Sequence, residues 1–199
     1  MTEPISEEMS PLWDIYNDGF PDFLAELLAA EELQRLKKVG MHCGCEYSSF
    51  PLFRFSSPYT RWIHSVGAGL IVWHFTFDVK QSIAGLLHDI ATPVFAHVVD
   101  FMKGDHLKQE STEEYTRKLI EESEGIQKVL HKYGLSTEDV ADYHRYPIAD
   151  NDSPGLSADR LEYTLGNFYC REKKSLGEIR RIYRNLTTIM NEEGIPELA

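Results

Sequence analysis

A histidine–aspartate pair, His88 and Asp89, closes an apolar run that begins at Ile83. A segment this apolar predicts a buried helix, and proteins rarely bury an imidazole and a carboxylate together without a partner. A divalent metal suits both groups, because neutral imidazole and carboxylate are common ligands. The pair therefore marks a candidate metal site.

Two further side chains lie in comparable surroundings, His64 in an earlier apolar segment and Asp159 in a later one. Gaps of 24 residues (88 − 64) and 70 residues (159 − 89) separate them from the pair. Two imidazoles and two carboxylates leave open positions on an octahedral ion, which favours Mn, Fe, Co or Ni, with Zn or Mg as alternatives. The simpler interpretation is a satisfied core histidine and an aspartate that favours a helix dipole.

The segments around these residues resemble the HD superfamily of metal-dependent phosphohydrolases, and most closely its deoxynucleoside triphosphate triphosphohydrolase branch. Arg61 and His64 match an Arg-x-x-His pattern, and residues 88–97 match His-Asp-x-x-x-x-x-Phe-x-His. Residues 159–163 match Asp-Arg-Leu-Asp/Glu-Tyr, and the resemblance extends over about residues 33–167. It implies an all-α HD-domain helical bundle. The metal ligands it implies are His64, His88, Asp89 and Asp159.

The resemblance also implies substrate contacts. Arg61 lies three residues before His64, so the two share a helix face, and a guanidinium can bind a phosphate with two hydrogen bonds. The alternative for Arg61 is a surface ion pair. Arg160 could contact a phosphate or orient a carboxylate.

Three more residues correspond to nucleotide contacts of that family. Tyr163 matches a tyrosine that contacts the sugar, and Asn167 stands where an aspartate binds a sugar hydroxyl. His42 falls where those enzymes carry a glutamine near the base. The alternatives are a core tyrosine, a solvated asparagine and an exposed loop histidine.

The chain departs from the family at two catalytic histidines, where it carries Thr92 and Thr112. Asp89 is expected to serve catalysis as a metal ligand. The best candidate for a replacement proton donor is His106, because histidine titrates near neutral pH and follows a glycine-containing turn here. Other titratable residues in this stretch are His97, Asp100, Asp105 and Glu110.

Composition indicates one ordinary globular domain of 199 residues, with 42% hydrophobic and 26% charged residues. The net charge of −12 argues against a nucleic-acid surface. The acidic N-terminus lacks a signal pattern, and no apolar stretch approaches the roughly 20 residues that span a bilayer. Three cysteines without a Cys-x-x-Cys motif predict neither disulfides nor a zinc ribbon. We therefore expect a cytoplasmic protein that does not insert into membranes.

Apolar periodicity predicts helices joined by short loops, without a convincing strand pair. A short N-terminal tail of about residues 1–10 precedes them, and a C-terminal helix of about 175–191 closes the domain. The predicted helices are 22–39, 60–75, 79–90, 109–123, 125–133, 136–144, 157–168 and 175–191. Thr60 is the expected N-cap of the second, and Gly67 and Gly69 should let a neighbouring helix approach it closely. Ser136 and Asp139 are the expected capping box of the sixth.

Residues 160–184 hold seven basic and three acidic residues, a local charge of +4. This stretch is either a solvated helix face or a basic surface that attracts phosphate groups towards Asp159. The sequence thus predicts a metal-dependent phosphohydrolase that acts on a phosphate ester or anhydride, with a nucleotide as the favoured substrate and a homo-oligomer as a further possibility. The alternatives are a degenerate HD domain that binds metal or nucleotide as a non-catalytic sensor, and a helical interaction domain with a structural metal.

Overall fold

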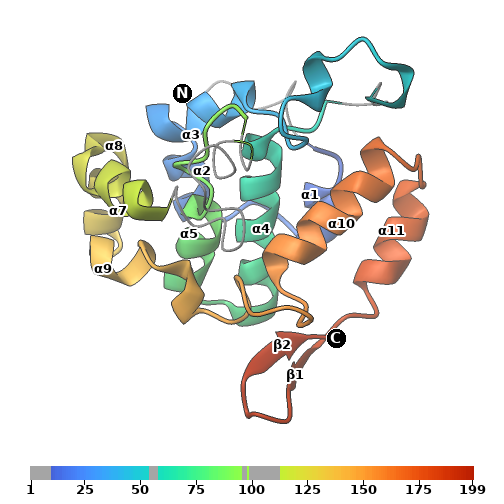
Figure 1. The fold of residues 1–199 in the computed structure, drawn as a ribbon. Helices are drawn as coiled ribbons and strands as arrows, with labels where there is room; N and C mark the ends of the chain where they lie inside the picture. The colour runs from blue at the N-terminus through green and yellow to red at the C-terminus, as the bar shows by residue number, and fades with distance from the viewer. Residues whose placement is uncertain (1–9, 54–57, 96–97, 99–112) are drawn as a thin grey trace.

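The computed structural model describes residues 10–53, 58–95, 98 and 113–199. Within these ranges the chain forms a bundle of helices with one small hairpin at its C-terminal end (Figure 1). The predicted all-α HD-domain bundle is confirmed. None of the described helices combines the length and apolarity needed to cross a membrane.

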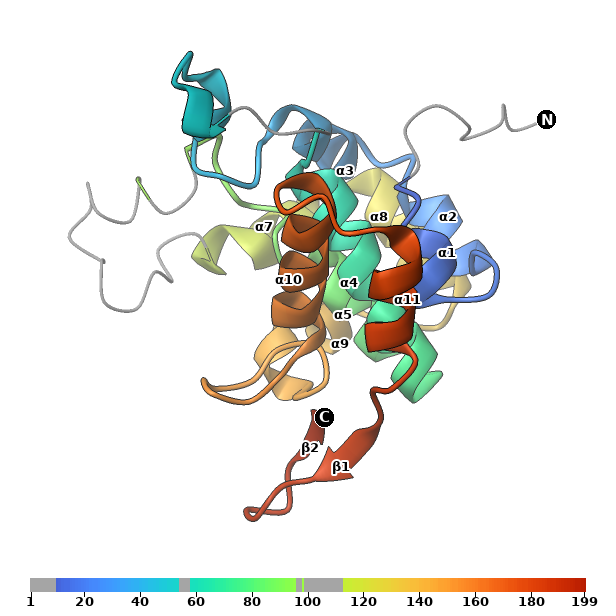
Figure 2. The same cartoon turned by 90° about the vertical axis from the view of Figure 1, so that its right-hand side faces the viewer.

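Three helices form the centre of the bundle: α4 (Arg61–Thr76), α5 (Val79–Leu87) and α10 (Ala158–Cys170). Helix α4 lies between the other two (Figure 2). It begins where predicted, because the Thr60 side chain accepts a hydrogen bond from the backbone N–H of Ile63 at 3.3 Å. Asp78 caps α5 in the same way, and Ser157 caps α10.

Two glycines let the central helices approach closely, as predicted. A methyl group at Gly67 would lie 2.6 Å from Cγ of Glu162 on α10. At Gly69 it would lie 3.2 Å from Cβ of Leu86 on α5. A third glycine, Gly166, faces the Tyr59 ring so closely that a methyl group would come within 2.3 Å of it. The packing of the bundle therefore requires glycine, which has no side chain, at these three contacts.

The predicted N-terminal helix 22–39 is wrong. The chain forms α2 (Asp22–Leu27), α3 (Glu31–Arg35) and the 3-10 turn η1 (Leu36–Lys38), after a short α1 (Trp13–Tyr16) that periodicity missed. The break occurs at Ala30, whose backbone is extended with ψ of 134°. Helix α8 passes against Ala30, and the bend keeps the leucines on both sides of it buried. Tertiary packing thus overrides a continuous helical pattern.

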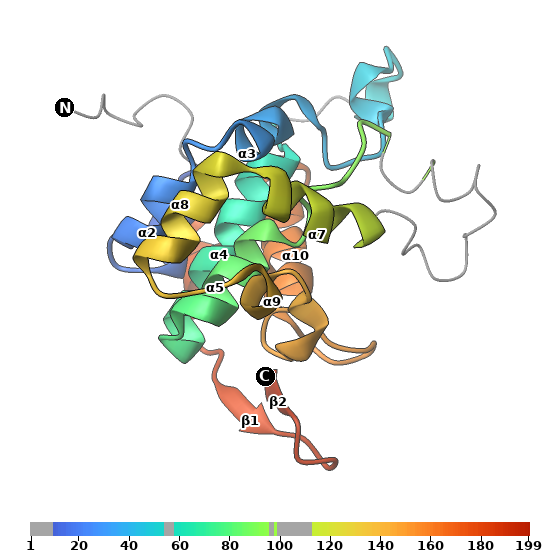
Figure 3. The same cartoon turned by 90° about the vertical axis from the view of Figure 1, so that its left-hand side faces the viewer.

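The segment after η1 is a loop, as predicted, with 3-10 turns η2 (Cys45–Tyr47) and η3 (Pro51–Phe53). On the far side of α5 lie α7 (Glu113–Glu122), α8 (Glu124–Lys132), α9 (Thr137–Val140) and the 3-10 turn η4 (Tyr143–Arg145) (Figure 3). The expected capping box of α9 is present, since the Asp139 carboxylate accepts from the backbone N–H of Ser136 at 3.0 Å.

The predicted C-terminal helix 175–191 is too long. Helix α11 (Leu176–Tyr183) ends early, and β1 (Thr188–Met190) pairs antiparallel with β2 (Pro196–Leu198). The Asn191 side chain accepts from two backbone N–H groups of the connecting turn, and Gly194 supplies its positive φ of 77°. Threonine and isoleucine before the turn favour extended backbone. The expectation of no strand pair is therefore also wrong.

The three cysteines are free thiols, as predicted. Cys170 is buried, and burial raises the pKa of its thiol to about 11. It is therefore protonated and unreactive near neutral pH.

Candidate metal centre

The four side chains proposed as metal ligands converge between α4, α5 and α10. Oδ1 of Asp159 lies 2.8 Å from Nε2 of His64 and 3.3 Å from Nε2 of His88. The two imidazole Nε2 atoms are 3.3 Å apart. Oδ2 of Asp89 lies 3.7 Å from the first imidazole and 3.5 Å from the second. The donor atoms of His64, His88 and Asp89 all lie within 4.8 Å of one another.

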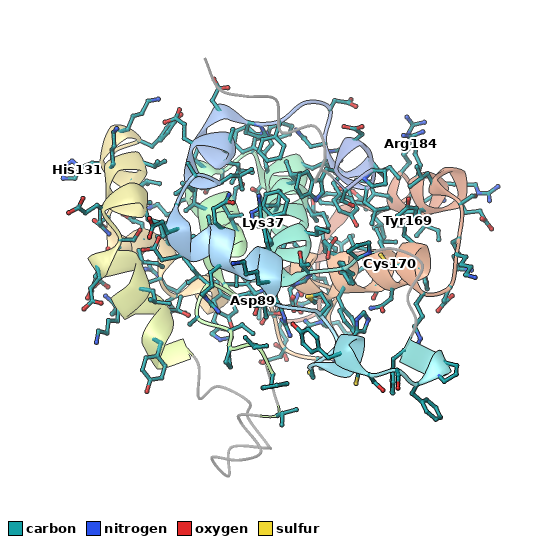
Figure 4. All side chains as sticks on the ribbon, turned by 90° about the horizontal axis from the view of Figure 1, so that it is seen from above. Lys37, Asp89, His131, Tyr169, Cys170 and Arg184 are labelled. Atoms are coloured by element: carbon teal, nitrogen blue, oxygen red, sulfur yellow. The ribbon has the colours of Figure 1, made fainter. Side chains whose placement is uncertain are left out.

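The end of α5 explains how adjacent residues can share one centre. The helix stops at Leu87, and His88 and Asp89 occupy the turn that follows. We expected both residues inside the helix, where neighbouring side chains point about 100° apart. Outside it, the turn lets both side chains face the same point. Figure 4 places Asp89 within the bundle, where 9% of the residue is exposed.

Each histidine is held through its other ring nitrogen. Nδ1 of His64 lies 2.7 Å from Oε2 of Glu162, and Nδ1 of His88 donates to the backbone carbonyl of Gly85 at 2.7 Å. These contacts direct both Nε2 atoms to the centre and fix the tautomer in which Nε2 is the free donor to a metal. Metal-ligating histidines are usually oriented in this manner.

Glu162 is the functional residue that sequence reasoning missed. It is fully buried, and its carboxylate accepts from Tyr59 Oη at 2.5 Å and from Tyr16 Oη at 3.3 Å, in addition to His64. Its side chain occupies the space left by Gly67. The available signal was its spacing, because a carboxylate three residues after Asp159 shares the same helix face.

Asp89 is held by two partners. Nη1 of Arg61 lies 2.6 Å from Oδ2 of Asp89, and Oγ1 of Thr92 donates to Oδ1 at 2.7 Å. Burial opposes ionisation, but the Arg61 guanidinium and the two histidines hold the pKa of the Asp89 carboxyl well below its usual value. Arg35 fixes the turn by donating to the backbone carbonyls of Ile90 and Thr92.

The charges of the centre fit a cation. Burial alone would lower the pKa of His64, yet hydrogen bonds to Asp159 and Glu162 raise it to about 10. The donors therefore attract positive charge strongly. Asp159 has a side chain that is 33% exposed, so the centre opens towards solvent on that side. A divalent metal with His64, His88, Asp89 and Asp159 as ligands fits this donor set.

The residues predicted to contact the nucleotide lie beside Asp159: Tyr163 and Asn167 on α10, and His42 next to Asn167. Asp159, Tyr163 and Asn167 are spaced by four residues on α10, so they lie along one face of that helix. The Tyr163 ring is 44% exposed. Nε2 of His42 lies 3.1 Å from Oδ1 of Asn167, which joins the loop after η1 to the end of this row.

Arg160 points away from the ligands and into the preceding loop. Its guanidinium donates to the backbone carbonyls of Gly155 and Asn151, and Nη1 lies 3.3 Å from Oδ1 of Asp150. That loop in turn supports α10, because the backbone N–H of Asp159 donates to the carbonyl of Ala149. In this arrangement the Arg160 guanidinium is bonded to the loop that supports the start of α10.

The proposed proton donor His106 lies outside the described residues. So do His97, Thr112 and the other titratable residues between Asp100 and Glu110. The roles predicted for them stay predictions. Thr92 is described, and where the resembled family has a catalytic histidine it orients Asp89 instead.

A fold of packed helices with a His/Asp cluster at its centre defines an HD-domain bundle. Among curated proteins, the chain is 26% identical over 163 residues to the metal-dependent phosphohydrolase cns2 of Cordyceps militaris, which covers 82% of this chain and 45% of that protein. This similarity supports the HD-domain superfamily. No family model matches the chain.

Two uncharacterised proteins are also similar. YdhJ of Bacillus subtilis is 35% identical over 147 residues, covering 73% of this chain and 43% of that protein. MJ1154 of Methanocaldococcus jannaschii is 28% identical over 182 residues, covering 88% of this chain and 36% of that protein. The chain thus spans less than half the length of the curated relatives it matches.

Proposed function

We propose that this chain is a metal-dependent phosphohydrolase that cleaves a phosphate ester or anhydride, with a nucleotide as substrate. The observation that carries the proposal is the convergence of two imidazole and two carboxylate groups, with both imidazoles held through their other ring nitrogen. Both Nδ1 atoms are engaged by Glu162 and Gly85, so the two Nε2 atoms face the centre. The similarity to a protein named as a metal-dependent phosphohydrolase supports this chemistry.

His64, His88, Asp89 and Asp159 would hold the metal, most suitably Mn, Fe, Co or Ni. Such an ion polarises a phosphoryl oxygen and lowers the pKa of a bound water to near neutrality. Arg61 keeps Asp89 ionised and places a fixed positive charge beside the position of a phosphate group. His106 stays the candidate proton donor.

The row on α10 supports a nucleotide. At 1.5 Å of rise per residue, Tyr163 and Asn167 lie roughly 6 and 12 Å along the helix from Asp159. A phosphate at the metal would therefore leave the sugar near Tyr163 and Asn167 and the base near His42. The exposed tyrosine ring offers a flat surface, and the amide and imidazole offer hydrogen bonds.

A second candidate is a non-catalytic sensor that binds metal and nucleotide. Thr92 favours it, because this residue replaces a catalytic histidine of the resembled branch and its hydroxyl is already used to hold Asp89. A threonine hydroxyl does not titrate near neutral pH, so it cannot replace the histidine as a proton donor.

The deciding experiment loads the purified chain with each candidate metal and incubates it with a panel of nucleotides and simple phosphate esters. Release of phosphate or pyrophosphate that disappears in Asp159→Ala, but not in the matched loop variant Asp152→Ala, supports the hydrolase. Asp152 is exposed and lies in the loop that precedes α10, the helix that carries Asp159. Nucleotide binding without turnover under every metal would instead establish the sensor.

A further inference from the structure

Among the described residues of this acidic chain, five exposed cations that make no ion pair lie around α11, while Lys38 on η1 and Lys128 on α8 are exposed elsewhere. Within the described residues, the cations of α4, α5, α7, α8 and the 151–160 region are largely tied into ion pairs or bonded to carbonyl groups. Five exposed basic residues around α11 make no ion pair in this part of the chain. We call them the α11 cations: Arg171, Lys173, Arg180, Arg181 and Arg184. Figure 4 shows Arg184 pointing away from the bundle.

The hairpin that follows α11 carries the opposite charge. Glu192 and Glu193 are exposed in its turn, and Glu197 lies half-buried on β2. These hairpin carboxylates also make no ion pair within the described chain. Because β1 begins only five residues after α11 ends, the hairpin lies next to α11 (Figure 2), and adjacent elements carry the α11 cations and the acidic turn.

The hairpin also has an unpartnered edge. The backbone pairs Thr187–Ala199 and Asn191–Ile195 are hydrogen bonded, so the outward groups of β1 belong to Thr188 and Met190. Neither finds a partner in the described residues. A two-stranded hairpin alone is marginally stable in water, and an open edge is a template for another strand.

Apolar side chains are also exposed on α11 and on the hairpin. Ile182 on α11 is 39% exposed, and the hairpin exposes Ile189, Met190 and Ile195 by 41%, 64% and 38%. The hairpin is anchored at its base, where the backbone N–H of Leu198 donates to the carbonyl of Leu156 at 3.1 Å. Beyond that point the hairpin lies at the edge of the bundle (Figure 1), and its turn residues Glu192, Glu193 and Ile195 line a cavity with the 151–156 loop.

We propose that this surface binds a second copy of the same chain about a twofold axis. Adjacent patches of opposite charge are self-complementary when two copies meet in antiparallel orientation about this axis, because each acidic turn then faces the other copy's α11 cations. The lengths match: α11 extends roughly 12 Å over eight residues. The hairpin extends roughly 10 Å over each three-residue strand. The apolar side chains and the β1 edge fill the middle of the interface.

The proposal does not depend on phosphohydrolase activity, and sedimentation velocity of the full chain tests it. We expect a dimer whose dissociation constant rises at least ~10-fold between low and high salt, since exposed charges are screened. The dissociation constant of the dimer should also rise at least ~10-fold in each of two double variants, Arg180→Glu/Arg181→Glu and Glu192→Arg/Glu193→Arg. A 1:1 mixture of the two variants should associate again, because the reversed charges are complementary; this recovery also shows that both variants are folded.

The matched control is Lys118→Glu/Lys128→Glu, which makes the same charge change on α7 and α8, away from the proposed interface. It should leave the dimer intact. A wild-type chain that is monomeric at all salt concentrations would overturn the proposal, as would a dimer that both interface variants leave unchanged. A monomer that instead binds RNA or anionic vesicles through the α11 cations would reassign this surface to a polyanion.

Discussion

At the scale of single residues, the centre depends as much on the groups behind the ligands as on the ligands. Glu162 is the main example, because one carboxylate accepts hydrogen bonds from two tyrosines and holds Nδ1 of His64. Removing its charge while preserving its shape tests whether it orients the metal ligand.

We expect Glu162→Gln to weaken metal binding roughly 10- to 100-fold, the usual scale for losing such a partner of a ligating histidine. The amide cannot accept as strongly from His64 and two hydroxyls at once. Isothermal titration with Co or Mn measures the affinity. Glu172→Gln, an exposed glutamate near the end of the same helix, is the control. Equal metal affinity in both variants would show that Glu162 serves packing alone.

Arg61 offers a test between two roles. It was predicted as a phosphate contact, and the structure places Nη1 2.6 Å from Oδ2 of Asp89, with only 7% of the residue exposed. Arg61→Ala removes the cation that keeps the Asp89 carboxyl ionised, so the pKa of Asp89 should rise and metal affinity should fall about 10-fold. Titrating metal and nucleotide separately distinguishes the roles. Weaker nucleotide binding with unchanged metal affinity would leave Arg61 as a substrate contact alone.

At the scale of elements, the site requires α4 and α10 to approach more closely than ordinary side chains permit. A methyl group at Gly67 would overlap Cγ of Glu162, which is buried and has no free space to occupy. The helix crossing and the orientation of His64 are therefore fixed by the same contact.

Gly67→Ala should destabilise the chain by roughly 1–3 kcal/mol through overpacking, despite the better helix propensity of alanine. Urea unfolding followed by circular dichroism measures the change, and metal content should fall in parallel. Gly177→Ala is the control, because the nearest atom to its added methyl group is 4.0 Å away. That variant should be neutral or slightly stabilised. Comparable stability of the two variants would contradict the proposed close contact.

At the scale of the whole molecule, a bound metal should stabilise the fold by holding distant segments of the chain together. Its ligands come from α4, the turn after α5, and α10, which are separated by long stretches of sequence. Binding to the folded chain but not to the unfolded chain stabilises by about 2.7 kcal/mol when the metal is at 100 times its dissociation constant.

For a chain of this size that stabilisation corresponds to a melting temperature higher by roughly 5–10 °C. Differential scanning calorimetry of chelated and metal-loaded protein measures the shift. Asp159→Ala should show a much smaller shift, whereas Asp152→Ala should behave like the wild type. Identical melting temperatures with and without metal would argue against the centre as a metal site.

The sequence by itself determined the helical fold, the identity of the four converging side chains and the caps at Thr60 and Ser136. These depend on local patterns: apolar periodicity, a side-chain acceptor at a helix start, and ligand types in apolar surroundings. The sequence also indicated that Gly67 and Gly69 would allow close helix packing, because glycine lets a neighbouring helix approach wherever its own helix lies.

Only the tertiary structure decided the rest. The break at Ala30 and the exit of His88 and Asp89 from α5 depend on neighbours that are distant in sequence, and the hairpin after α11 was hidden by a helix-compatible pattern. Glu162 was matched only as a motif position, and its role was missed because that role depends on Tyr16, Tyr59 and His64 meeting it in space. Long-range hydrogen bonds and packing contacts produce no pattern in the local sequence. The residues that make them can therefore be identified only when the positions of the helices are known.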